Sequence, residues 1–283
     1  MTSLHFTKMH GLGNDYVYID AFAQPIADPV ALARRVSPRH TGIGSDGLIV
    51  ICPSSVADCR MEMYNADGSR GQMCGNGIRC VGKYVWDHAL ARRNPLRVET
   101  DAGIKELQLH LRDNRVEQVT VDMGAPILDG PRIPVAAEGR VIAAPLDVSG
   151  QRYRITCVSM GNPHCVVFVD DVDSLALSAI GPQFEHHVFF PQRINTEFIH
   201  VLGSHEVRMR VWERGSGETQ ACGTGACAAV VAGVLNGKHE RRATVHLLGG
   251  DLDIEWRAGD DRVMMTGPAT EVFSGELVEL EAN

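Results

Sequence analysis

The strongest constraint on the fold is a set of short motifs that occurs twice along the 283-residue chain. The motif Cys-Gly-x-Gly begins at Cys74 and again at Cys222, 148 residues later. The same spacing, to within one residue, separates Gly13-Asn14 from Gly161-Asn162, Tyr64-Asn65 from Trp212-Glu213, and Asp113-Asn114-Arg115-Val116 from Asp260-Asp261-Arg262-Val263. Self-similarity at one fixed spacing indicates a duplication, and this spacing is much longer than the repeats of solenoid proteins. We therefore predict two similar domains.

Each half contains short β-branched runs with turn residues between them, which predict strands. The expected strands are residues 16–20, 48–52, 97–100 and 107–111 in the first half, and residues 165–169, 197–200, 207–212 and 253–256 in the second. Each Cys-Gly-x-Gly motif is expected to open a helix, which continues over residues 78–88 and 226–235. The second helix is almost wholly apolar, so we expect a buried central helix wrapped by strands. The predicted fold class is α+β with two pseudo-symmetric duplicated domains, residues 1–122 and 123–267, joined by the Pro- and Gly-containing stretch 123–150.

Composition and charge exclude some classes of function. The formal net charge is −8, and lysine occurs at four positions only. Because nucleic-acid binding requires clustered lysine and arginine, we expect no nucleic-acid partner. No basic-then-apolar leader opens the chain, and no apolar run reaches the roughly 18 residues of a membrane span. We expect a cytoplasmic protein with no membrane partner.

The chain has eight cysteines but no CxxC pair, which argues against the common zinc and thioredoxin motifs. In a reducing compartment, a cysteine is by default a buried free thiol that packs as a small hydrophobic group. This interpretation suits Cys52, Cys59, Cys80, Cys157, Cys165 and Cys227. Cys74 and Cys222 differ because each stands at the predicted start of a helix. We expect no metal site.

The predicted position of Cys74 and Cys222 suggests a chemical role. The first turn of a helix has unpaired N–H groups and the positive end of the helix dipole, and glycines let an anion approach that backbone closely. The same field favours the thiolate form of a cysteine. Two such elements facing each other could grip one carboxylate, while a thiolate removes the α-proton from one face and a thiol returns a proton to the other. The alternative is that both cysteines are structural caps beside structural glycines.

The motifs resemble those of the diaminopimelate epimerase family over essentially the whole chain. The resemblance is carried by residues 6–15 (FTKMHGLGND), 64–69 (YNADGS), 73–80 (MCGNGIRC), 161–164 (GNPH), 212–215 (WERG) and 217–225 (GETQACGTG). It implies that each domain is a β-barrel-like sheet around a central helix, with a C-terminal strand in residues 268–283 that packs back onto the first domain. It also implies a homodimer that interconverts LL- and meso-diaminopimelate for bacterial lysine and peptidoglycan precursor synthesis, with no cofactor.

The resemblance assigns roles to individual residues as well. Cys74 and Cys222 are the acid–base pair, and His164 and Glu213 tune the proton affinity of their thiols. The α-carboxylate at the reacting centre is held by the backbone of Gly75, Asn76, Gly223 and Thr224. The distal end of the substrate is held by Asn14, Asn65, Asn162, Asn195, Glu213 and Arg214. An arginine suits a distal carboxylate because guanidinium binds it through two parallel hydrogen bonds.

One position departs from the family pattern. Some members carry glutamine where this chain has Gly47, so we expect no side-chain contact with substrate there. Simpler interpretations also exist for some assigned residues. Asn14 and Asn162 precede turn-prone residues, so local Asx-turns compete with ligand binding. Glu213 and Arg214, considered alone, would form an exposed pair of little energetic value.

Three other functions compete with the epimerase. A proline or hydroxyproline racemase would share the duplicated fold and paired cysteines, but a small apolar ring would leave Asn65, Asn195 and Arg214 without partners. A thiol redox or metal-binding protein would use Cys74 and Cys222 together, although neither lies in a cluster with ligand spacing. A non-catalytic anion-binding module would not need two intact cysteines. Turnover on proline and bound zinc are the observations that would favour the first two.

Overall fold

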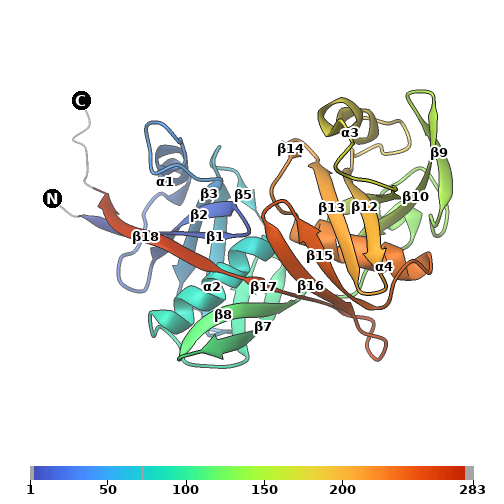
Figure 1. The fold of residues 1–283 in the computed structure, drawn as a ribbon. Coiled ribbons are helices and arrows are strands. Elements are labelled where there is room, and N and C mark those ends of the chain that lie inside the picture. The colour runs from blue at the N-terminus through green and yellow to red at the C-terminus, as the bar shows by residue number, and fades with distance from the viewer. Residues whose placement is uncertain (1–2, 72, 278–283) are drawn as a thin grey trace. The chain divides into compact units, whose positions relative to one another are not determined.

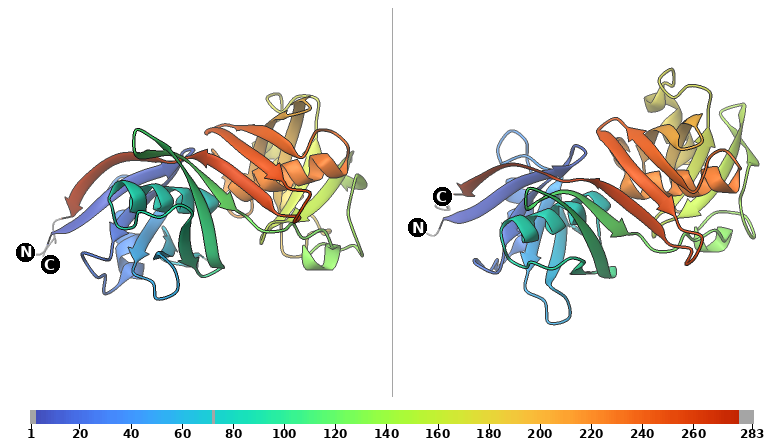
Figure 2. Two further views of the ribbon diagram at one scale, coloured as in Figure 1. Left: turned by 90° about the horizontal axis from the view of Figure 1, so that it is seen from below. Right: turned by 60° about the horizontal axis from the view of Figure 1, so that its bottom comes forward.

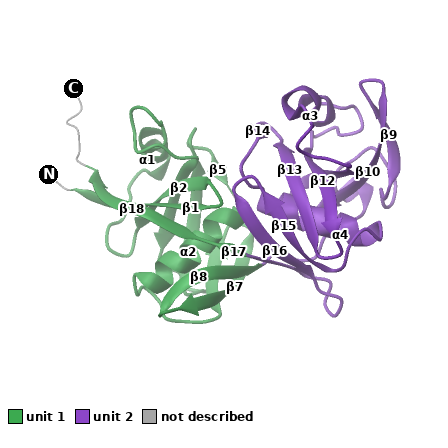
Figure 3. Cartoon of the chain, viewed as in Figure 1, with its two compact units in different colours: residues 1–121, 267–283 green, residues 122–266 purple. Residues whose placement is uncertain are grey.

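The computed structural model describes residues 3–71 and 73–277. The chain forms two compact units, residues 1–121 with 267–283 and residues 122–266 (Figures 1 and 3). It therefore leaves the first unit once and returns to it near its C-terminal end. Residues 278–283 of the expected C-terminal strand lie outside the described residues.

The first unit is a mixed sheet with two helices. Its strands are β1 (Leu4–Gly11), β2 (Asn14–Asp20), β3 (Gly47–Cys52), β4 (Cys59–Asn65), β5 (Arg70–Gly71), β6 (Leu96–Thr100), β7 (Gly103–Arg112), β8 (Arg115–Asp122) and β18 (Thr270–Leu277), and its helices are α1 (Pro29–Val36) and α2 (Gly75–Asp87). The strand order is β18–β1–β2–β3–β4–β6–β7–β8, with the short β5 beside β4. The β2/β3 and β4/β6 pairs are parallel, and the other pairs are antiparallel.

The second unit repeats this arrangement. Its strands are β9 (Ala144–Val148), β10 (Gln151–Ser159), β11 (Pro163–Phe168), β12 (Asn195–Gly203), β13 (Glu206–Glu213), β14 (Gly217–Glu218), β15 (Arg242–Leu247), β16 (Gly250–Trp256) and β17 (Val263–Pro268). Its helices are α3 (Leu177–Glu185), α4 (Gly223–Leu235) and the 3₁₀ turn η1 (Gly130–Arg132). The order is β9–β10–β11–β12–β13–β15–β16–β17, and β11/β12 and β13/β15 are the parallel pairs.

The two strand orders match position by position, which confirms the predicted α+β fold of duplicated halves. The C-terminal strand β18 takes the place in the first unit that β9 takes in the second, and it pairs with β1 in antiparallel fashion. Helix α2 contacts β1, β2, β7 and β18, and helix α4 contacts β10, β11, β12, β15 and β16. Each helix thus lies among the strands of its own unit (Figures 1 and 2).

Both central helices begin at the glycine that follows the motif cysteine. Cys74 and Cys222 are the N-cap residues of α2 and α4, with extended backbones at φ −127° and −118°. The Cys-Gly-x-Gly motifs therefore open both helices, as predicted, and the helices continue to Asp87 and Leu235. The apolar helix α4 is buried over ten of its residues, as its sequence predicted.

The shorter helices were not predicted from the sequence. Helix α1 follows Asp28, whose carboxylate accepts a hydrogen bond from the N–H of Ala31 at 2.9 Å, and proline occupies its first position. Helix α3 contains Pro182 and also Gly181, where an added Cβ would lie 2.2 Å from the Trp212 ring. Short helices with internal proline or glycine lack the long apolar period that identifies a helix.

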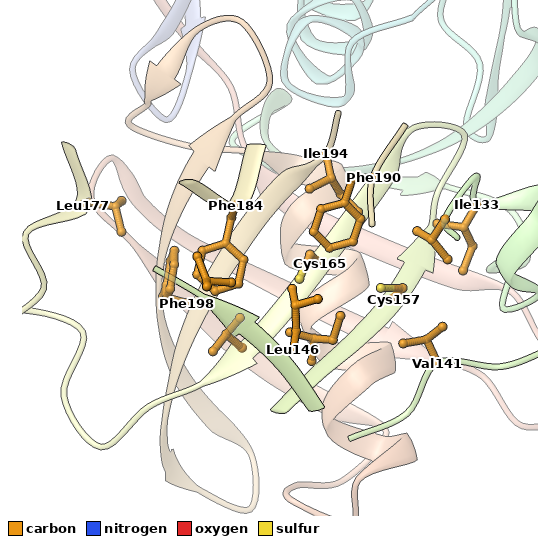
Figure 4. Close-up of a cluster of buried hydrophobic side chains, with 14 of the residues drawn as sticks. Ile133, Val141, Leu146, Cys157, Cys165, Leu177, Phe184, Phe190, Ile194 and Phe198 are labelled. Carbon is orange, nitrogen blue, oxygen red and sulfur yellow. The ribbon is translucent and has the colours of Figure 1, made fainter. Parts of the chain in front are cut away.

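Each sheet has one helix on each of its two faces. Alternate side chains of a strand point to opposite faces, so neighbouring residues pack against different helices. On β3, Leu48 and Val50 pack in one core cluster with residues of α1, and Ile49 between them approaches α2. The second unit has the same outer core, in which Phe184 of α3 meets Phe198 of β12 edge-to-face at 5.4 Å (Figure 4). Cys157 and Cys165 belong to this cluster, so they act as packing groups there (Figure 4).

Candidate active site

In the first unit, the Cys74 thiol caps helix α2. The N–H of Gly77 points to its Sγ at 3.4 Å, and the carbonyl of Cys74 accepts the first helical hydrogen bond from Ile78 at 2.9 Å. The thiol is half-buried. A half-buried sulfur at the start of a helix can exchange a proton with a bound molecule, unlike the fully buried cysteines elsewhere in this unit.

Asn14 and Asn76 form one hydrogen-bonded cluster with this thiol. The Cys74 thiol donates to Asn14 Oδ1 at 3.3 Å, and Asn76 Nδ2 donates to the same oxygen at 3.4 Å. Asn14 Nδ2 in turn donates to Asp46 at 2.8 Å, which fixes the orientation of the Asn14 carboxamide. The side chain of Asn14 thus turns toward the thiol. Asp46 has an orienting role that sequence reasoning missed, since it had no assigned function there.

Tyr16 completes the surroundings of Cys74. It is buried, and burial raises the pKa of its phenol, with further increases from the nearby charges of Cys74 and Asp46. Tyr16 was not predicted as a site residue, although it occupies the position 148 residues before His164. A neutral hydroxyl is therefore present beside Cys74.

Asn65 and Gly47 lie at the ends of the paired strands β4 and β3. The Asn65 carboxamide donates to Ser69 Oγ at 2.9 Å within its own turn, so its described hydrogen bond does not join the Cys74 cluster. At Gly47 an added Cβ would lie 2.1 Å from the Tyr64 carbonyl oxygen. This chain therefore has no room for a side chain at position 47, which agrees with the expectation that Gly47 makes no side-chain contact.

In the second unit, Cys222 has the same capping position but a different environment. Its side chain is buried, and its Sγ lies 3.6 Å from Thr224 Oγ1. Burial raises the pKa of the Cys222 thiol well above its usual value, and the charges of Glu213 and Glu197 raise it further. The Thr224 hydroxyl and the Gly225 N–H act in the opposite direction. The simple expectation of a thiolate-favouring helix start is therefore wrong for Cys222, because burial and two carboxylates outweigh these local hydrogen bonds.

His164 is fully buried and has a partner at each ring nitrogen. Its Nδ1 lies 2.7 Å from Glu197 Oε1, and its Nε2 lies 3.0 Å from Asn162 Oδ1. The structure thus brings together two of the expected site residues, His164 and Asn162, and adds Glu197. Sequence reasoning missed Glu197 because it treated residues 197–200 only as a strand.

Asn195 positions the segment that carries Glu213 and Arg214. The Asn195 carboxamide donates to the Pro163 carbonyl at 2.9 Å and accepts from the Arg214 N–H at 2.9 Å. The Arg214 guanidinium donates to the Gln192 carbonyl at 2.9 Å and is exposed. Its hydrogen bonds therefore leave the charged end of Arg214 at the surface, where it can meet an anion.

Three further hydrogen bonds support this segment. The Thr219 hydroxyl donates to Glu213 Oε1 at 2.5 Å. The buried carboxylate of Glu185 accepts hydrogen bonds from Trp212 Nε1 at 2.8 Å and from the Gly215 N–H at 3.0 Å. Thr219 and Glu185 were both missed from the sequence, because Glu185 lies on the unpredicted helix α3 and Thr219 carries no signal of its own.

Among residues 3–71 and 73–277, no group of three or more His, Cys, Asp and Glu side chains is arranged to hold a metal ion. Over the same residues, no helix combines the length and apolar character needed to cross a membrane.

The sequence of this chain matches a known protein family. The family model described as diaminopimelate epimerase matches residues 6–128 and 156–272. The diaminopimelate epimerase of Acetivibrio thermocellus is 55% identical over 97% of this chain and 98% of its own length. That of Agathobacter rectalis is 56% identical over 97% of this chain and 99% of its own length. Such identity over almost complete chains covers both cysteine motifs.

Solved structures of lower identity share the fold. A phenazine biosynthesis protein of the PhzF family from Bacillus anthracis superposes with a TM-score of 0.70 at 16% identity, covering 99% of this chain and 100% of its own. A hydroxyproline epimerase from Agrobacterium vitis gives 0.69 at 16% identity, covering 98% of this chain and 91% of its own. These likenesses concern the fold alone. On the sequence match over nearly its full length, the chain belongs to the diaminopimelate epimerase family of isomerases.

Proposed function

We propose that this protein interconverts LL- and meso-2,6-diaminopimelate by a two-thiol acid–base mechanism that uses no cofactor. The observation that carries the proposal is the equivalence of Cys74 and Cys222. Each caps the N-terminus of a 13-residue central helix that opens with Gly-x-Gly, and the two stand 148 residues apart in duplicated units. Duplication of an acid–base group suits inversion at carbon, which needs one such group for each face.

In this proposal the substrate α-carboxylate binds at the N–H groups of the first helical turns, through Gly75-Asn76 and Gly223-Thr224. These donors stabilise the negative charge that spreads onto the carboxylate oxygens when the α-proton leaves. One cysteine thiolate accepts that proton and becomes a thiol. The other cysteine thiol delivers its proton to the opposite face of the carbon and becomes a thiolate. No proton is gained or lost in a turnover, and the two cysteines exchange protonation states.

The raised pKa of Cys222 suggests how the two thiols share these tasks. Burial and the neighbouring carboxylates Glu213 and Glu197 hold the proton on Cys222. We therefore assign Cys222 as the proton donor and Cys74 as the proton acceptor, which first releases the hydrogen that its thiol directs at Asn14. His164 and Glu213, which the family resemblance assigned to tuning, lie in the unit of Cys222.

The distal end of the substrate decides between diaminopimelate and proline. Diaminopimelate has a second amino group and a second carboxylate, for which Glu213 and Arg214 provide opposite charges, with Asn14, Asn65, Asn162 and Asn195 as amide partners. Proline has neither distal group and would leave these polar side chains without partners. The hydroxyproline epimerase among the structural relatives is only 16% identical, so it supports the fold but not that substrate.

The test is proton NMR of the purified protein with LL-diaminopimelate in D₂O, alongside Cys74→Ser and Cys222→Ser. We expect the meso isomer to appear with deuterium at one α-carbon, and both variants to lose this activity. A chelator should leave the rate unchanged, and the protein should show no pyridoxal phosphate absorbance. Exchange on proline in place of diaminopimelate would support the racemase alternative, and full activity in either variant would refute the two-thiol mechanism.

We also propose a cytoplasmic homodimer, with the enzyme serving bacterial lysine and peptidoglycan precursor synthesis as the family resemblance implies. The support for a dimer is apolar exposure on strand β18, whose only described pairing partner is β1. Val272 is 54% exposed and Phe273 is 47% exposed. Light scattering should give twice the 30.8 kDa mass of the chain, and Val272→Lys with Phe273→Lys should reduce it to that of a monomer.

A further inference from the structure

Glu197 on strand β12 is a buried carboxylate outside the set that the family resemblance assigned. Its side chain has no exposed surface, its Oε1 lies 2.7 Å from His164 Nδ1, and its Oε2 has no hydrogen-bond partner within the described part of the chain. Burying a carboxylate costs several kcal/mol unless it is paired, so such a group persists only where something depends on it.

The first unit shows that the fold itself does not require a carboxylate at this place. The residue 148 positions before Glu197 is Ile49, which is fully buried on the equivalent strand β3. An added Cβ on Gly77 of α2 would lie 2.6 Å from Ile49 Cδ1, and one on Gly225 of α4 would lie 2.7 Å from Glu197 Oε1. The two side chains therefore fill matching spaces against the first turn of matching helices. Isoleucine satisfies the packing in one unit, and the other unit has a carboxylate instead.

The contacts of His164 indicate what the carboxylate does. Its two ring nitrogens face a carboxylate oxygen of Glu197 and a carboxamide oxygen of Asn162, at 2.7 and 3.0 Å. Donation to both oxygens at once requires a hydrogen on each ring nitrogen, which is the imidazolium form of the ring. Glu197 is then ionised, and the buried pair is neutral as a whole. Burial raises the pKa of Glu197, and the charge of His164 opposes that rise without cancelling it.

We propose that Glu197 is a positioning residue that keeps His164 protonated at both nitrogens and thereby orients Asn162. With its Oδ1 held by His164 Nε2–H, the Asn162 carboxamide keeps its Nδ2 group for a ligand. This group has no hydrogen bond to another described residue, and Asn162 is partly exposed. An N–H₂ donor in this place binds a carboxylate oxygen. The identity of that carboxylate as part of diaminopimelate rests on the proposed function.

The first experiment needs no turnover. Nitrogen-15 NMR of histidine-labelled protein, with His164 assigned by His164→Gln, reports the protonation of each ring nitrogen. We expect both His164 nitrogens to carry a hydrogen in the native protein, and one of them to lose it in Glu197→Gln. A neutral His164 in the native protein, or an unchanged signal in Glu197→Gln, would overturn the proposal even if the enzyme is an active epimerase.

Other ionisable groups near the His164–Glu197 pair also affect how the His164 nitrogen-15 signal changes with pH. These are Glu213 on β13, Cys222 at the start of α4 and Cys165 on β11, all of which interact electrostatically with Glu197. Repeating the titration in Cys222→Ala and in Glu213→Gln separates their contributions. The His164 imidazolium should persist in both variants and disappear only when Glu197 is changed.

The second experiment uses steady-state KM values to measure how strongly the effect of Glu197 depends on Asn162. Glu197→Gln and Asn162→Ala should each raise KM for diaminopimelate by roughly tenfold, the value of one charge-assisted hydrogen bond. Because Glu197 acts through Asn162, the double variant should be no worse than Asn162→Ala alone, whereas independent effects would multiply. Multiplication of the two effects would refute the positioning role. Absence of any wild-type turnover would instead refute the proposed function and leave the NMR result intact.

Glu197→Ile separates positioning from structure, since isoleucine is the residue of the first unit. This variant should fold with a Tm equal to or above that of the native protein, yet lose the His164 imidazolium and show the raised KM. A matched control is Asp87→Asn, which removes a carboxylate that accepts from Lys83 at the C-terminal end of α2. It should lower Tm and leave KM unchanged. A normal KM in Glu197→Ile would show that the carboxylate has no role in the site.

Discussion

The two units present the same backbone and different electrostatics at their central helices. Cys74 lies beside the amide of Asn14 and the hydroxyl of Tyr16, with the carboxylate of Asp46 bonded to Asn14. Cys222 lies near Glu213 and the His164–Glu197 pair. In the duplicated sequence, Tyr16 of the first unit is equivalent to His164 of the second, and Ile49 is equivalent to Glu197. Duplication thus supplies two similar frameworks, and a few substitutions give the two thiols different charge environments, as an acid and a base working together require.

The comparison extends to the ends of the strands that carry the polar residues. Asn195 starts β12 and holds the Arg214 N–H, whereas the matching residue Gly47 starts β3 and has no space for a side chain. The residue that matches Arg214 is Ala66. The charged residue Arg214 of the second unit thus corresponds to an uncharged residue of the first.

The largest expected effect comes from replacing either motif cysteine, which tests whether both cysteines take part in catalysis. Cys74→Ala and Cys222→Ala should each lower kcat by about 10²- to 10⁴-fold, the contribution of one acid–base group. Initial rates in both reaction directions, with circular dichroism as the check on folding, provide the measurement. A folded variant that loses less than tenfold in both directions would show that its unit contributes binding only.

The next largest effect is expected from Arg214, the residue proposed to bind the distal carboxylate of the substrate. Arg214→Ala gives the second unit the residue found at position 66, and it should raise KM for diaminopimelate by roughly 10- to 100-fold through loss of a bidentate carboxylate contact. Arg214→Lys should recover only part of this loss, because an ammonium cannot form the paired hydrogen bonds. The control is Arg152→Ala, which breaks an exposed contact with Asp147 and should leave KM unchanged. Equal KM values for all three variants would exclude Arg214 from substrate binding.

A stability effect distinguishes the two helix starts. Gly77→Ala would place its methyl near the tip of Ile49, which can rotate, so we expect a loss of about 1 kcal/mol. Gly225→Ala would place it near Glu197 Oε1, which is held by His164, so the loss should reach about 3 kcal/mol. Urea unfolding of both variants measures the difference. A larger loss for Gly77→Ala would contradict the inferred rigidity of the Glu197–His164 pair.

These comparisons also show what the sequence could and could not reveal. The duplication, the strand pattern and the capping position of both cysteines could be predicted, because repeated motifs and local capping chemistry are properties of short segments. Glu197 could not, because its function depends on pairing with His164 across the parallel strands β11 and β12. The same holds for Asp46, which reaches Asn14 from 32 residues away. Which polar groups meet is decided by tertiary packing, and a single sequence does not record it.

The smallest expected effect concerns the pKa of Cys222. Burial raises this pKa first, and the negative charge of Glu213 raises it next, because a nearby carboxylate opposes formation of a thiolate. Glu213→Gln removes that charge while burial remains, so the pKa of Cys222 should fall but stay above its ordinary value. Carbon-13 NMR of Cβ-labelled cysteine, with Cys222 assigned by Cys222→Ala, follows the titration in the free enzyme.

The same raised pKa has a consequence for stability whose sign is fixed. Above the ordinary thiol pKa of about 8.5, the unfolded chain loses the Cys222 proton while the folded chain keeps it, so the free energy of unfolding falls as pH rises. This decline should be shallower in Glu213→Gln, whose folded-state pKa lies closer to the unfolded value, and its Cys222 contribution should vanish in Cys222→Ala. Urea unfolding between about pH 7 and pH 10 tests both statements. A Cys222 titration that moves upward in Glu213→Gln, or a steeper loss of stability, would mean that Glu213 acts on this thiol through packing and not through its charge.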